Sequence, residues 1–568
     1  MLLMVVTFCC LNYLWMRSYR FGMLLDIDEA GYIALAVSYA RAMIYGGISG
    51  WLHALWSPIS IAPLTSTVAS ITMSIHGVSE NTALLTNTVL EACLLIVVYA
   101  TTRRLSDTTT ALLAAFLVAT TPLITDFSRN FQFAMGAALF FSSAVYFHLR
   151  SNDFEKRAPS ILVGVCLALM TLSRTMAVAF LPVFAIVFLV SAALTTGIDV
   201  QRRRNILLAI GAFFLVAAPW YLRNFHNVFG YLFTFGYGAA ASEYGSEVGI
   251  FTLANLASRI EALLGAFHAI HFFIVFPAFV CVLAVGIWNK FDFRKHNSNS
   301  IIYYYALLAF GCLFVLATSR NRGNGFSIPI MPLLVIVAAV GINLALRKTL
   351  VRNAIYILLL LASGVVGYAS QDIKACSVFP QNLDMFGQGA AILFDCEEPI
   401  YKYITSNGVE GLVSRDTRDP SAPPNLDQDI SRKWRDLSVT AADEISRLLP
   451  GGRGLVAYGS RHALFNTNTV SLEQIKRYGR ISSAIQIEPS LSKNTQDDYL
   501  DWLRSGGGSE ACVVVLLDSN LGEFHPYPNI EKMVEALTEA GYLVSKSVPT
   551  PTPGQHVNFW FKKTANCS

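Results

Sequence analysis

Three carboxylates stand within four positions near the N-terminus, at Asp26, Asp28 and Glu29. They directly follow the first hydrophobic segment, so they lie at the membrane boundary, where charges are costly and usually mark a site. A positioned carboxylate can take the proton of an attacking hydroxyl, which is the task of a general base. The alternative is that they are ordinary solvated loop residues, and the arginines described next weigh against it.

Arginines recur at the ends of hydrophobic segments, on the side where orientation does not require them: Arg129, Arg174, Arg223, Arg320 and Arg322. A lone arginine at a membrane boundary usually extends its head group into water from an apolar stem. Arginine is also the natural receptor for a phosphate, because its fork binds two oxygens and keeps its charge. Both sets of residues together predict a cavity with a carboxylate on one wall and phosphate-binding arginines, some of these five, on the other.

The elements that carry these residues are predicted to be membrane helices. Of the 568 residues, 54% are hydrophobic and only 14% are charged, with a mean hydropathy of +0.48. Soluble proteins carry about 25% charged residues. The composition therefore predicts a polytopic α-helical membrane protein and gives no reason to expect a nucleic-acid partner.

Eleven apolar segments are predicted to span the bilayer: 1–16, 84–102, 107–124, 132–149, 159–172, 177–197, 206–222, 268–288, 301–318, 327–346 and 353–370. Basic clusters such as Arg103-Arg104 fall in every second connection, as cytoplasmic loops require. The N-terminus is then cytoplasmic, and both the carboxylates and residues after 370 are extracytoplasmic. We expect the first segment to be a retained helix, in the plasma (inner) membrane.

The first outer loop, residues 17–83, is predicted to hold two helices lying along the membrane, 28–48 and 58–76. Counting 58–76 as a span would place Arg103-Arg104 and every later basic loop on the outer side of the membrane. The predicted domains are residues 1–371, which include this loop, and an extracytoplasmic α/β domain, residues 372–568. In that domain the pattern indicates strands at 454–458, 484–487, 512–517 and 557–561, helices at 439–449, 494–505 and 529–540, and a loop over 405–438.

Four of the ten cysteines, Cys376, Cys396, Cys512 and Cys567, fall in this outer domain. An even number in an oxidising compartment predicts at least one disulfide. Cys376 with Cys396 is the favoured pair because it closes a short loop. Free buried thiols are the alternative.

The stretch Asp28-Glu29-Ala30-Gly31-Tyr32 resembles the Asp-Glu motif in the first outer loop of GT-C glycosyltransferases, in particular the protein O-mannosyltransferase and aminoarabinose-lipid A transferase group. Further resemblances follow in order along residues 20–345: Ser128-Arg129, Leu172-Ser173-Arg174, Pro219-Trp220-Tyr221-Leu222-Arg223-Asn224, and Arg322 with Ile328-Pro329-Ile330-Met331-Pro332. The family often has an Asp after Ser-Arg, where this chain has Asn130-Phe131-Gln132-Phe133. Asp126 is the nearest substitute.

The resemblance implies a transferase that moves a sugar from a polyprenyl-phosphate donor to an extracytoplasmic lipid, glycan or protein acceptor by inverting displacement. Asp28 takes the place of the family's base, with Asp26 and Glu29 as rivals. Glu29 has two alternative roles: to hold the loop by pairing with an arginine, or to bind a divalent cation. No spacing demands a metal. Tyr32 and His53 are candidate acceptor or donor contacts, although a lone histidine among aromatic residues is more often simply packed.

Two other classes of function compete with this reading. A flippase or exporter of lipid-linked sugars should place ionisable groups near the middle of its spans. In this chain they gather at one membrane face, which favours a surface active site. A non-catalytic component of cell-envelope assembly is the third interpretation, because the outer domain resembles no known module.

Overall fold

The computed structural model describes residues 1–25, 27–195, 199–236, 238, 252–288, 298–319, 321, 325–346, 349–369, 382–385, 388–391, 428–459, 465–487, 495–518, 529–552, 554–563 and 567. The chain divides into two compact units. The bundle unit comprises Met1–Trp15, Leu55–Val68 and Leu84–Ile404, and the α/β unit comprises Met16–Ala54, Ala69–Ala83 and Thr405–Ser568. The predicted division at residue 371 stays a prediction.

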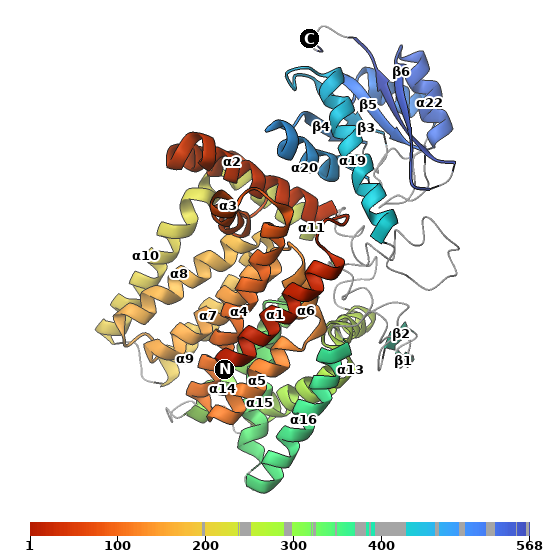
Figure 1. Ribbon diagram of the computed structural model, residues 1–568. Coiled ribbons are helices and arrows are strands. Elements are labelled where there is room, and N and C mark those ends of the chain that lie inside the picture. The colour runs from red at the N-terminus through yellow and green to blue at the C-terminus, as the bar shows by residue number, and fades with distance from the viewer. Residues whose placement is uncertain are drawn as a thin grey trace. The chain divides into compact units, whose positions relative to one another are not determined.

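The bundle unit is built from helices, shown in Figure 1 from red to green. They are α1 (Leu2–Tyr19), α4 (Glu80–Leu105), α5 (Thr108–Ala119), α6 (Pro122–Arg129), α7 (Ala134–Ser151), α8 (Arg157–Ser173), the 3₁₀ turn η1 (Thr175–Phe180), α9 (Leu181–Thr195), α10 (Val200–Arg223), α11 (Phe225–Gly236), α13 (Leu253–Trp288), α14 (Ser298–Ala317), α15 (Met331–Ala345) and α16 (Thr349–Ala369). A short hairpin, β1 (Asn382–Met385) and β2 (Gln388–Ala391), follows them. A helix covers each of the eleven predicted spans, so the mostly helical membrane fold is confirmed.

Fewer helices than the eleven predicted spans are long and apolar enough to cross a membrane. Among the described residues, six helices are long and apolar enough to cross a membrane, or seven if the bent pair α5 and α6 is one span. Three more apolar helices, Arg157–Ser173, Ile301–Ala317 and Met331–Ala345, are shorter than such a span. Eleven crossings therefore stay a prediction.

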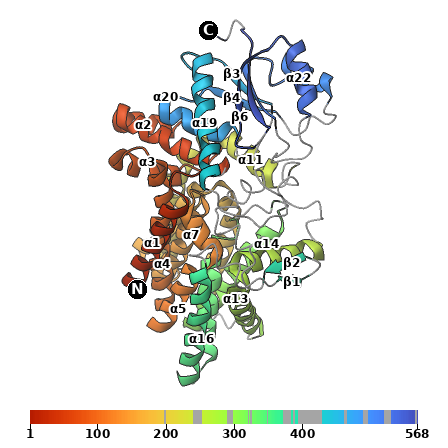
Figure 2. The same cartoon turned by 45° about the vertical axis from the view of Figure 1, so that its right-hand side comes forward.

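The bend of 62° between α5 and α6 has a local cause. Pro122 lies in the first turn of α6, where it cannot donate a backbone hydrogen bond to α5. The hydroxyls of Thr120 and Thr121 donate instead to the carbonyls of Phe116 and Leu117. On its other side α5 lies beside α16 (Figure 2), and Thr110 of α5 hydrogen-bonds Tyr356 of α16.

Helices α8 and α10 run side by side in the same direction. Where they begin, Asn205 donates to the carbonyls of Phe154 and Glu155, and where they end, the Tyr221 hydroxyl donates to the carbonyl of Thr171. Midway, Gly164 of α8 packs directly on the Ala209 carbonyl, where a Cβ atom has no room.

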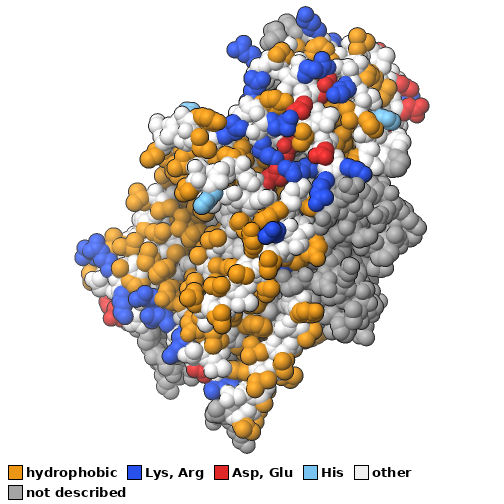
Figure 3. All heavy atoms as spheres, viewed as in Figure 1, with side chains coloured by type: hydrophobic (Ala, Val, Ile, Leu, Met, Phe, Trp, Pro, Cys, Tyr) orange, Lys and Arg blue, Asp and Glu red, His pale blue; other side chains and the backbone are white. Residues whose placement is uncertain are grey.

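Figure 3 shows apolar side chains over most of this face of the bundle, with basic side chains gathered where α8 and α10 begin. Lys156, Arg157, Arg203 and Arg204 are exposed there. Arg174 follows the last residue of α8 and Arg223 is the last residue of α10. Two of the five predicted phosphate-binding arginines therefore lie where α8 and α10 end, opposite the basic side chains where these helices begin.

The α/β unit contains a five-stranded sheet of order β4-β3-β5-β7-β6, in which β4, β3 and β5 are parallel and β7 and β6 are antiparallel to their neighbours. Its elements are α19 (Gln428–Leu448), β3 (Leu455–Tyr458), α20 (Thr467–Tyr478), β4 (Ser483–Gln486), α21 (Gln496–Arg504), β5 (Ala511–Leu517), α22 (Ile530–Glu539), β6 (Leu543–Pro549) and β7 (His556–Phe561). All seven residues of β5 are buried, as expected of a central strand covered on both faces. The predicted α/β fold is confirmed.

Three details of that prediction differ from the structure. Residues 428–438 are not loop but the first half of α19, whose apolar face buries Trp434, Leu437 and Ala441. Helix α20 and strand β6 were not predicted. Strand β6 is exposed along most of its length, so it lacks the apolar run that marks a buried strand.

The two segments predicted to lie along the outer face of the membrane are helical as predicted, in α2 (Ile27–Leu55) and α3 (Leu64–His76). Helix α2 is kinked at Gly47, whose φ of 61° an L side chain rarely adopts.

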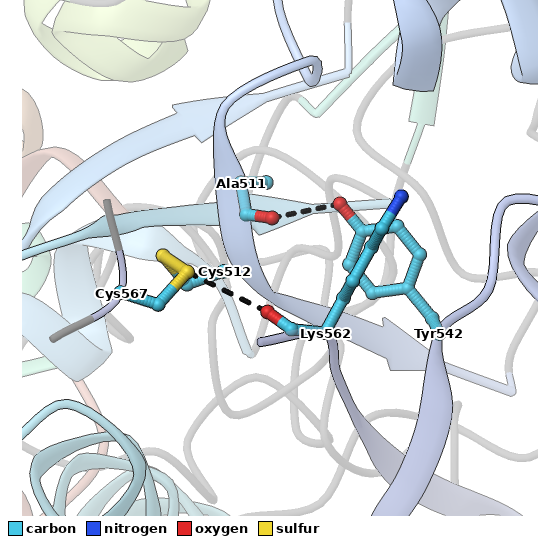
Figure 4. Close-up of a disulfide and its surroundings, with 5 residues drawn as sticks. All are labelled: Ala511, Cys512, Tyr542, Lys562 and Cys567. Atoms are coloured by element: carbon cyan, nitrogen blue, oxygen red, sulfur yellow. Dashed lines mark hydrogen bonds between the residues drawn. A yellow bond between two sulfur atoms is a disulfide. The ribbon is translucent and has the colours of Figure 1, made fainter. Parts of the chain in front are cut away.

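A disulfide joins Cys512 on β5 to Cys567 near the C-terminus, 55 residues later (Figure 4). Beside it the Tyr542 hydroxyl donates to the carbonyl of Ala511, and the Lys562 ammonium lies 5.5 Å from the Tyr542 ring centre. At least one disulfide among the outer cysteines is thus confirmed. The favoured pair, Cys376 with Cys396, lies outside the described residues.

Candidate functional site

The predicted carboxylates lie in the α/β unit, and two of them have opposite surroundings. Glu29 is fully buried, and its Oε2 lies 2.6 Å from Nη2 of Arg20, which is also fully buried. Nη1 of Arg20 donates to the carbonyl of Leu24 at 3.3 Å. The pair therefore ties the loop before α2 to the first turn of that helix, which matches the loop-holding alternative for Glu29.

Asp28 is exposed in the first turn of α2. The backbone amides at a helix N-terminus favour a negative charge, so the site suits an ionised carboxylate. Of the two described carboxylates of the motif, only Asp28 is accessible to a substrate. Asp26 lies outside the described residues.

The candidate contact residues Tyr32 and His53 occupy the two ends of α2. Tyr32 is half-buried, one turn after Asp28, whereas His53 is exposed in the last turn, beyond the kink. The helix therefore places Tyr32 near the carboxylate motif and does not bring His53 there.

Three of the five predicted arginines are described, Arg129, Arg174 and Arg223, and they have different settings in the bundle unit. Arg129, at the end of α6, is 1% exposed. Its Nε donates to Oδ1 of Asn12 at 2.9 Å, and its guanidinium lies 4.5 Å from the Trp15 ring centre. Nδ2 of Asn12 in turn donates to Glu91 and to Ser128, both at 2.8 Å. This buried network joins α1, α4 and α6.

Asp126 is buried on the same helix α6, 1% exposed. The Asn130 amide lies 3.5 Å from its Oδ2. It is thus as enclosed as Arg129.

Arg174 lies at the junction of α8 and η1, half-buried. Its Nη1 donates to the carbonyl of Gly325 at 2.9 Å, and its guanidinium lies 4.3 Å from the Phe326 ring centre. Gly325 has a φ of 84°, and a Cβ atom there would lie 2.6 Å from the Phe127 ring, so only glycine fits.

Arg174 lines a cavity of about 190 Å³ whose other walls are almost entirely apolar. The lining comes from η1, α11, the end of α14 and the segment before α15, and includes Met176, Phe180, Phe229, Leu232, Phe233, Leu316, Phe326 and Pro329. Among the described residues, Ser319 and Asn321 are its other polar side chains. A slot of this kind suits the apolar part of a ligand, with an arginine at its border.

Arg223 is exposed at the end of α10, with its Nε 3.5 Å from the carbonyl of Trp56. The next residue, Asn224, is buried and accepts a hydrogen bond from the backbone amide of Ile59 at 2.7 Å. Arg320 and Arg322 lie outside the described residues. Of the predicted arginines that the structure describes, Arg174 is the one that lines this cavity.

Metal binding was left open by the sequence. Over the described residues, no group of three or more His, Cys, Asp or Glu side chains could hold a metal ion. Asp26 is not among those residues, so the acidic motif itself is untested.

Sequence reasoning did not name Arg20, Asn12 or Glu91. Arg20 carried a weak signal, a cation just after the first apolar segment and nine positions before Glu29. Asn12 and Glu91 lie inside predicted spans, where a polar side chain indicates that it has a buried partner. Which residue is the partner follows only from how the helices pack.

These observations define the class: a multi-pass membrane protein with the GT-C fold. The structure is similar to that of ArnT from Cupriavidus metallidurans bound to undecaprenyl phosphate, with 14% identity and a TM-score of 0.56 over 98% of this chain and 97% of that chain. It is also similar to the oligosaccharyltransferase of Archaeoglobus fulgidus in complex with Zn and sulfate, with 13% identity and a TM-score of 0.51 over 90% of this chain and 67% of that chain.

The sequence profile of the dolichyl-phosphate-mannose-protein mannosyltransferase family matches residues 60–222. No curated protein sequence matches the chain significantly. The matched stretch contains Arg129 and Arg174 and ends before Arg223. The family and both structural neighbours are glycosyltransferases, which confirms the resemblance seen in the sequence.

Proposed function

We propose that this protein is a membrane glycosyltransferase that takes its sugar from a polyprenyl-phosphate donor and transfers it to an acceptor outside the cytoplasm. The observation that carries the proposal is the cavity at Arg174, because it sets apolar walls beside an arginine side chain. An isoprenoid phosphate has the matching parts, an apolar chain and one anionic head.

The chemistry divides between two kinds of residue. Breaking the bond between the anomeric carbon and the phosphate oxygen leaves a lipid phosphate that gains negative charge, and Arg174 stabilises that charge. The acceptor hydroxyl forms the new bond from the opposite face of the sugar and gives its proton to Asp28. One displacement of this kind inverts the configuration at the anomeric carbon.

Within this proposal the other predicted residues take lesser parts. Glu29 holds the loop through Arg20 and does not act as the base. Arg129 supports the bundle from within, while Arg223, Arg320, Arg322 and Asp26 remain candidates for further donor contacts or, for Asp26, the base. The acceptor is a hydroxyl of a lipid, glycan or protein.

The test measures the two roles separately. In a deletion strain, mass spectrometry of lipid extracts should reveal a polyprenyl-phosphate sugar that accumulates and that disappears when the wild-type gene is restored. Asp28→Asn should leave the lipid accumulated, because loss of a general base slows transfer by about 10²–10⁴-fold. Asp501→Asn, an exposed aspartate on α21, is the matched control and should restore transfer.

Binding of polyprenyl phosphate to the purified protein in nanodiscs tests the donor half. Arg174→Ala should weaken binding, whereas Arg203→Ala, at the opposite end of the adjacent helix, should not. Asp28→Asn should bind as the wild type does. If no polyprenyl-phosphate sugar accumulates and Arg174→Ala binds normally, the glycosyltransferase proposal is wrong and a carrier becomes the better explanation.

A further inference from the structure

The loop that precedes Asp28 is anchored in the core of the α/β unit. Leu24 is 2% exposed and belongs to the apolar cluster formed by residues of α19, β3, β5 and β7, including Trp434 and Val513. Two residues earlier, the carbonyl of Gly22 accepts a hydrogen bond from Nη1 of Arg435 at 2.9 Å. The backbone that leads to the motif is therefore held by residues more than 400 positions away.

Charged contacts strengthen the same anchorage. Arg435 Nη2 also lies 2.9 Å from Oε1 of Glu80, which begins α4 but belongs to the α/β unit. Lys476 of α20 pairs with Glu80 as well, and with Glu473 at 2.8 Å. Glu80 and Glu473 are largely buried, whereas Arg435 and Lys476 are partly exposed, so only the carboxylate side of each pair is shielded from water.

Asn468 of α20 contacts the motif itself. Its Nδ2 donates to the carbonyl of Ile27, the residue before Asp28, at 2.8 Å. A Cβ atom added to Gly31 would lie 2.9 Å from the same Nδ2, so the amide also abuts α2 one turn later. Asn468 thus touches the backbone on both sides of Asp28.

The start of α20 is fixed independently of this contact. Asn466 caps the helix by accepting from the amides of Asn468 and Thr469, and the Thr469 side chain closes the capping box. Such a box satisfies two backbone donors that would otherwise lack partners. Asn468 therefore projects from a well-defined helix end.

We propose that Asn468 is a positioning residue that sets the orientation of the first turn of α2, and hence of the Asp28 carboxylate, during sugar transfer. This inference rests on the function proposed above. Misplacing a catalytic group by about 1 Å can cost about 10²-fold in rate, so a single well-placed amide is enough to matter. It also gives the otherwise unassigned C-terminal region a task in catalysis.

The experiment uses the full-length protein in nanodiscs and the transfer assay with the accumulated lipid as donor. Asn468→Ala and Gly31→Ala should each lower kcat by about 10- to 100-fold, while KM for the donor and binding of polyprenyl phosphate stay unchanged. Gly46→Ala is the matched control for Gly31→Ala, since it lies in the same helix with no atom within 4 Å of the added Cβ. Asn529→Ala, at the N-cap of α22, is the control for Asn468→Ala.

A double-mutant cycle separates positioning from simple loss of stability. In the Asp28→Asn background, Asn468→Ala should lower the residual rate no further, because the group that it orients is already inactive. Hydrogen exchange should be faster in the peptide around residues 20–32 of Asn468→Ala, and unchanged in Asn529→Ala.

The outcomes distinguish the two proposals. If Asp28→Asn abolishes transfer but Asn468→Ala keeps the wild-type kcat, the positioning role is wrong and the proposed function stands. Equal losses in Asn468→Ala and Asn529→Ala, or additive losses in the cycle, would also overturn it by showing a structural effect only. If Asp28→Asn transfers normally, Asp28 is not the base, and the positioning role, which acts through Asp28, is overturned. Loss of transfer in Asp26→Asn would then keep the glycosyltransferase proposal and assign the base to Asp26.

Discussion

Two adjacent residues, Asp28 and Glu29, show how a helix separates functions that the sequence places together. Successive residues of an α-helix point about 100° apart. One carboxylate is therefore exposed while its neighbour is buried against Arg20. The Glu29 carboxylate is paired with Arg20 in the interior, so Glu29 cannot replace Asp28 at the surface.

At the residue scale, we predict that Glu29→Gln destabilises the protein whereas Asp28→Asn does not. Removing one member of a buried ion pair leaves the other charge uncompensated, which costs about 3–5 kcal/mol. The melting temperature of the purified protein should fall clearly for Glu29→Gln and stay within error for Asp28→Asn. Replacing both partners, as Arg20→Met with Glu29→Leu, should recover part of the loss. Equal melting temperatures for the two single variants would show that the ion pair does not hold the loop.

At the scale of the elements, the pairing of α8 and α10 depends on the small size of Gly164. Its contact with the Ala209 carbonyl lets the two backbones approach closely, as small residues do between membrane helices.

We predict that Gly164→Ala forces the two helices apart and lowers stability by about 1–3 kcal/mol, the usual cost of overpacking. Gly211→Ala on α10, where nothing lies within 4 Å of the added atom, should be neutral or slightly stabilising. Thermal unfolding of both variants in the same detergent measures the difference. A Gly164→Ala protein as stable as the Gly211→Ala protein would contradict the close packing.

The helices and the central strands could be predicted because apolar runs report burial directly. Helix α20 and strand β6 could not. The former is short and mostly polar, and the latter is an exposed edge strand with Lys546 in it. The contact between Asn468 and Ile27 joins residues 441 positions apart and leaves no local pattern.

The sequence predicted which residues belong to the candidate site but not the role of each residue. Residue type and position identified Asp28 and Arg174, yet they could not tell Arg174, which lines a cavity, from the enclosed Arg129. That difference arises from Asn12, Trp15 and Glu91, which reach Arg129 only through the packing of α1, α4 and α6.

At the scale of the whole molecule, the alternating basic loops predict that the connection between α7 and α8 and the C-terminal region lie on opposite sides of the membrane. We expect a cysteine placed at the exposed Arg504 to react with a membrane-impermeant thiol reagent in intact cells. A cysteine at the exposed Lys156 should react only after the cells are permeabilised. The wild-type protein measures labelling of the natural thiols, and reaction of both sites in intact cells would refute the topology.

The composition of the α/β unit has a consequence for how the protein is made. Its parts come from the beginning and the end of the chain, Met16–Ala54 and Ala69–Ala83 with Thr405–Ser568. A ribosome adds about 5–20 residues per second, so the roughly 350 residues between Ala54 and Thr405 take about 20–70 s to translate. During that interval Asp28 has been synthesised, but Arg435, Asn468 and the apolar residues that surround Leu24 have not. Biosynthesis itself thus delays assembly of the carboxylate loop until the last segment has emerged.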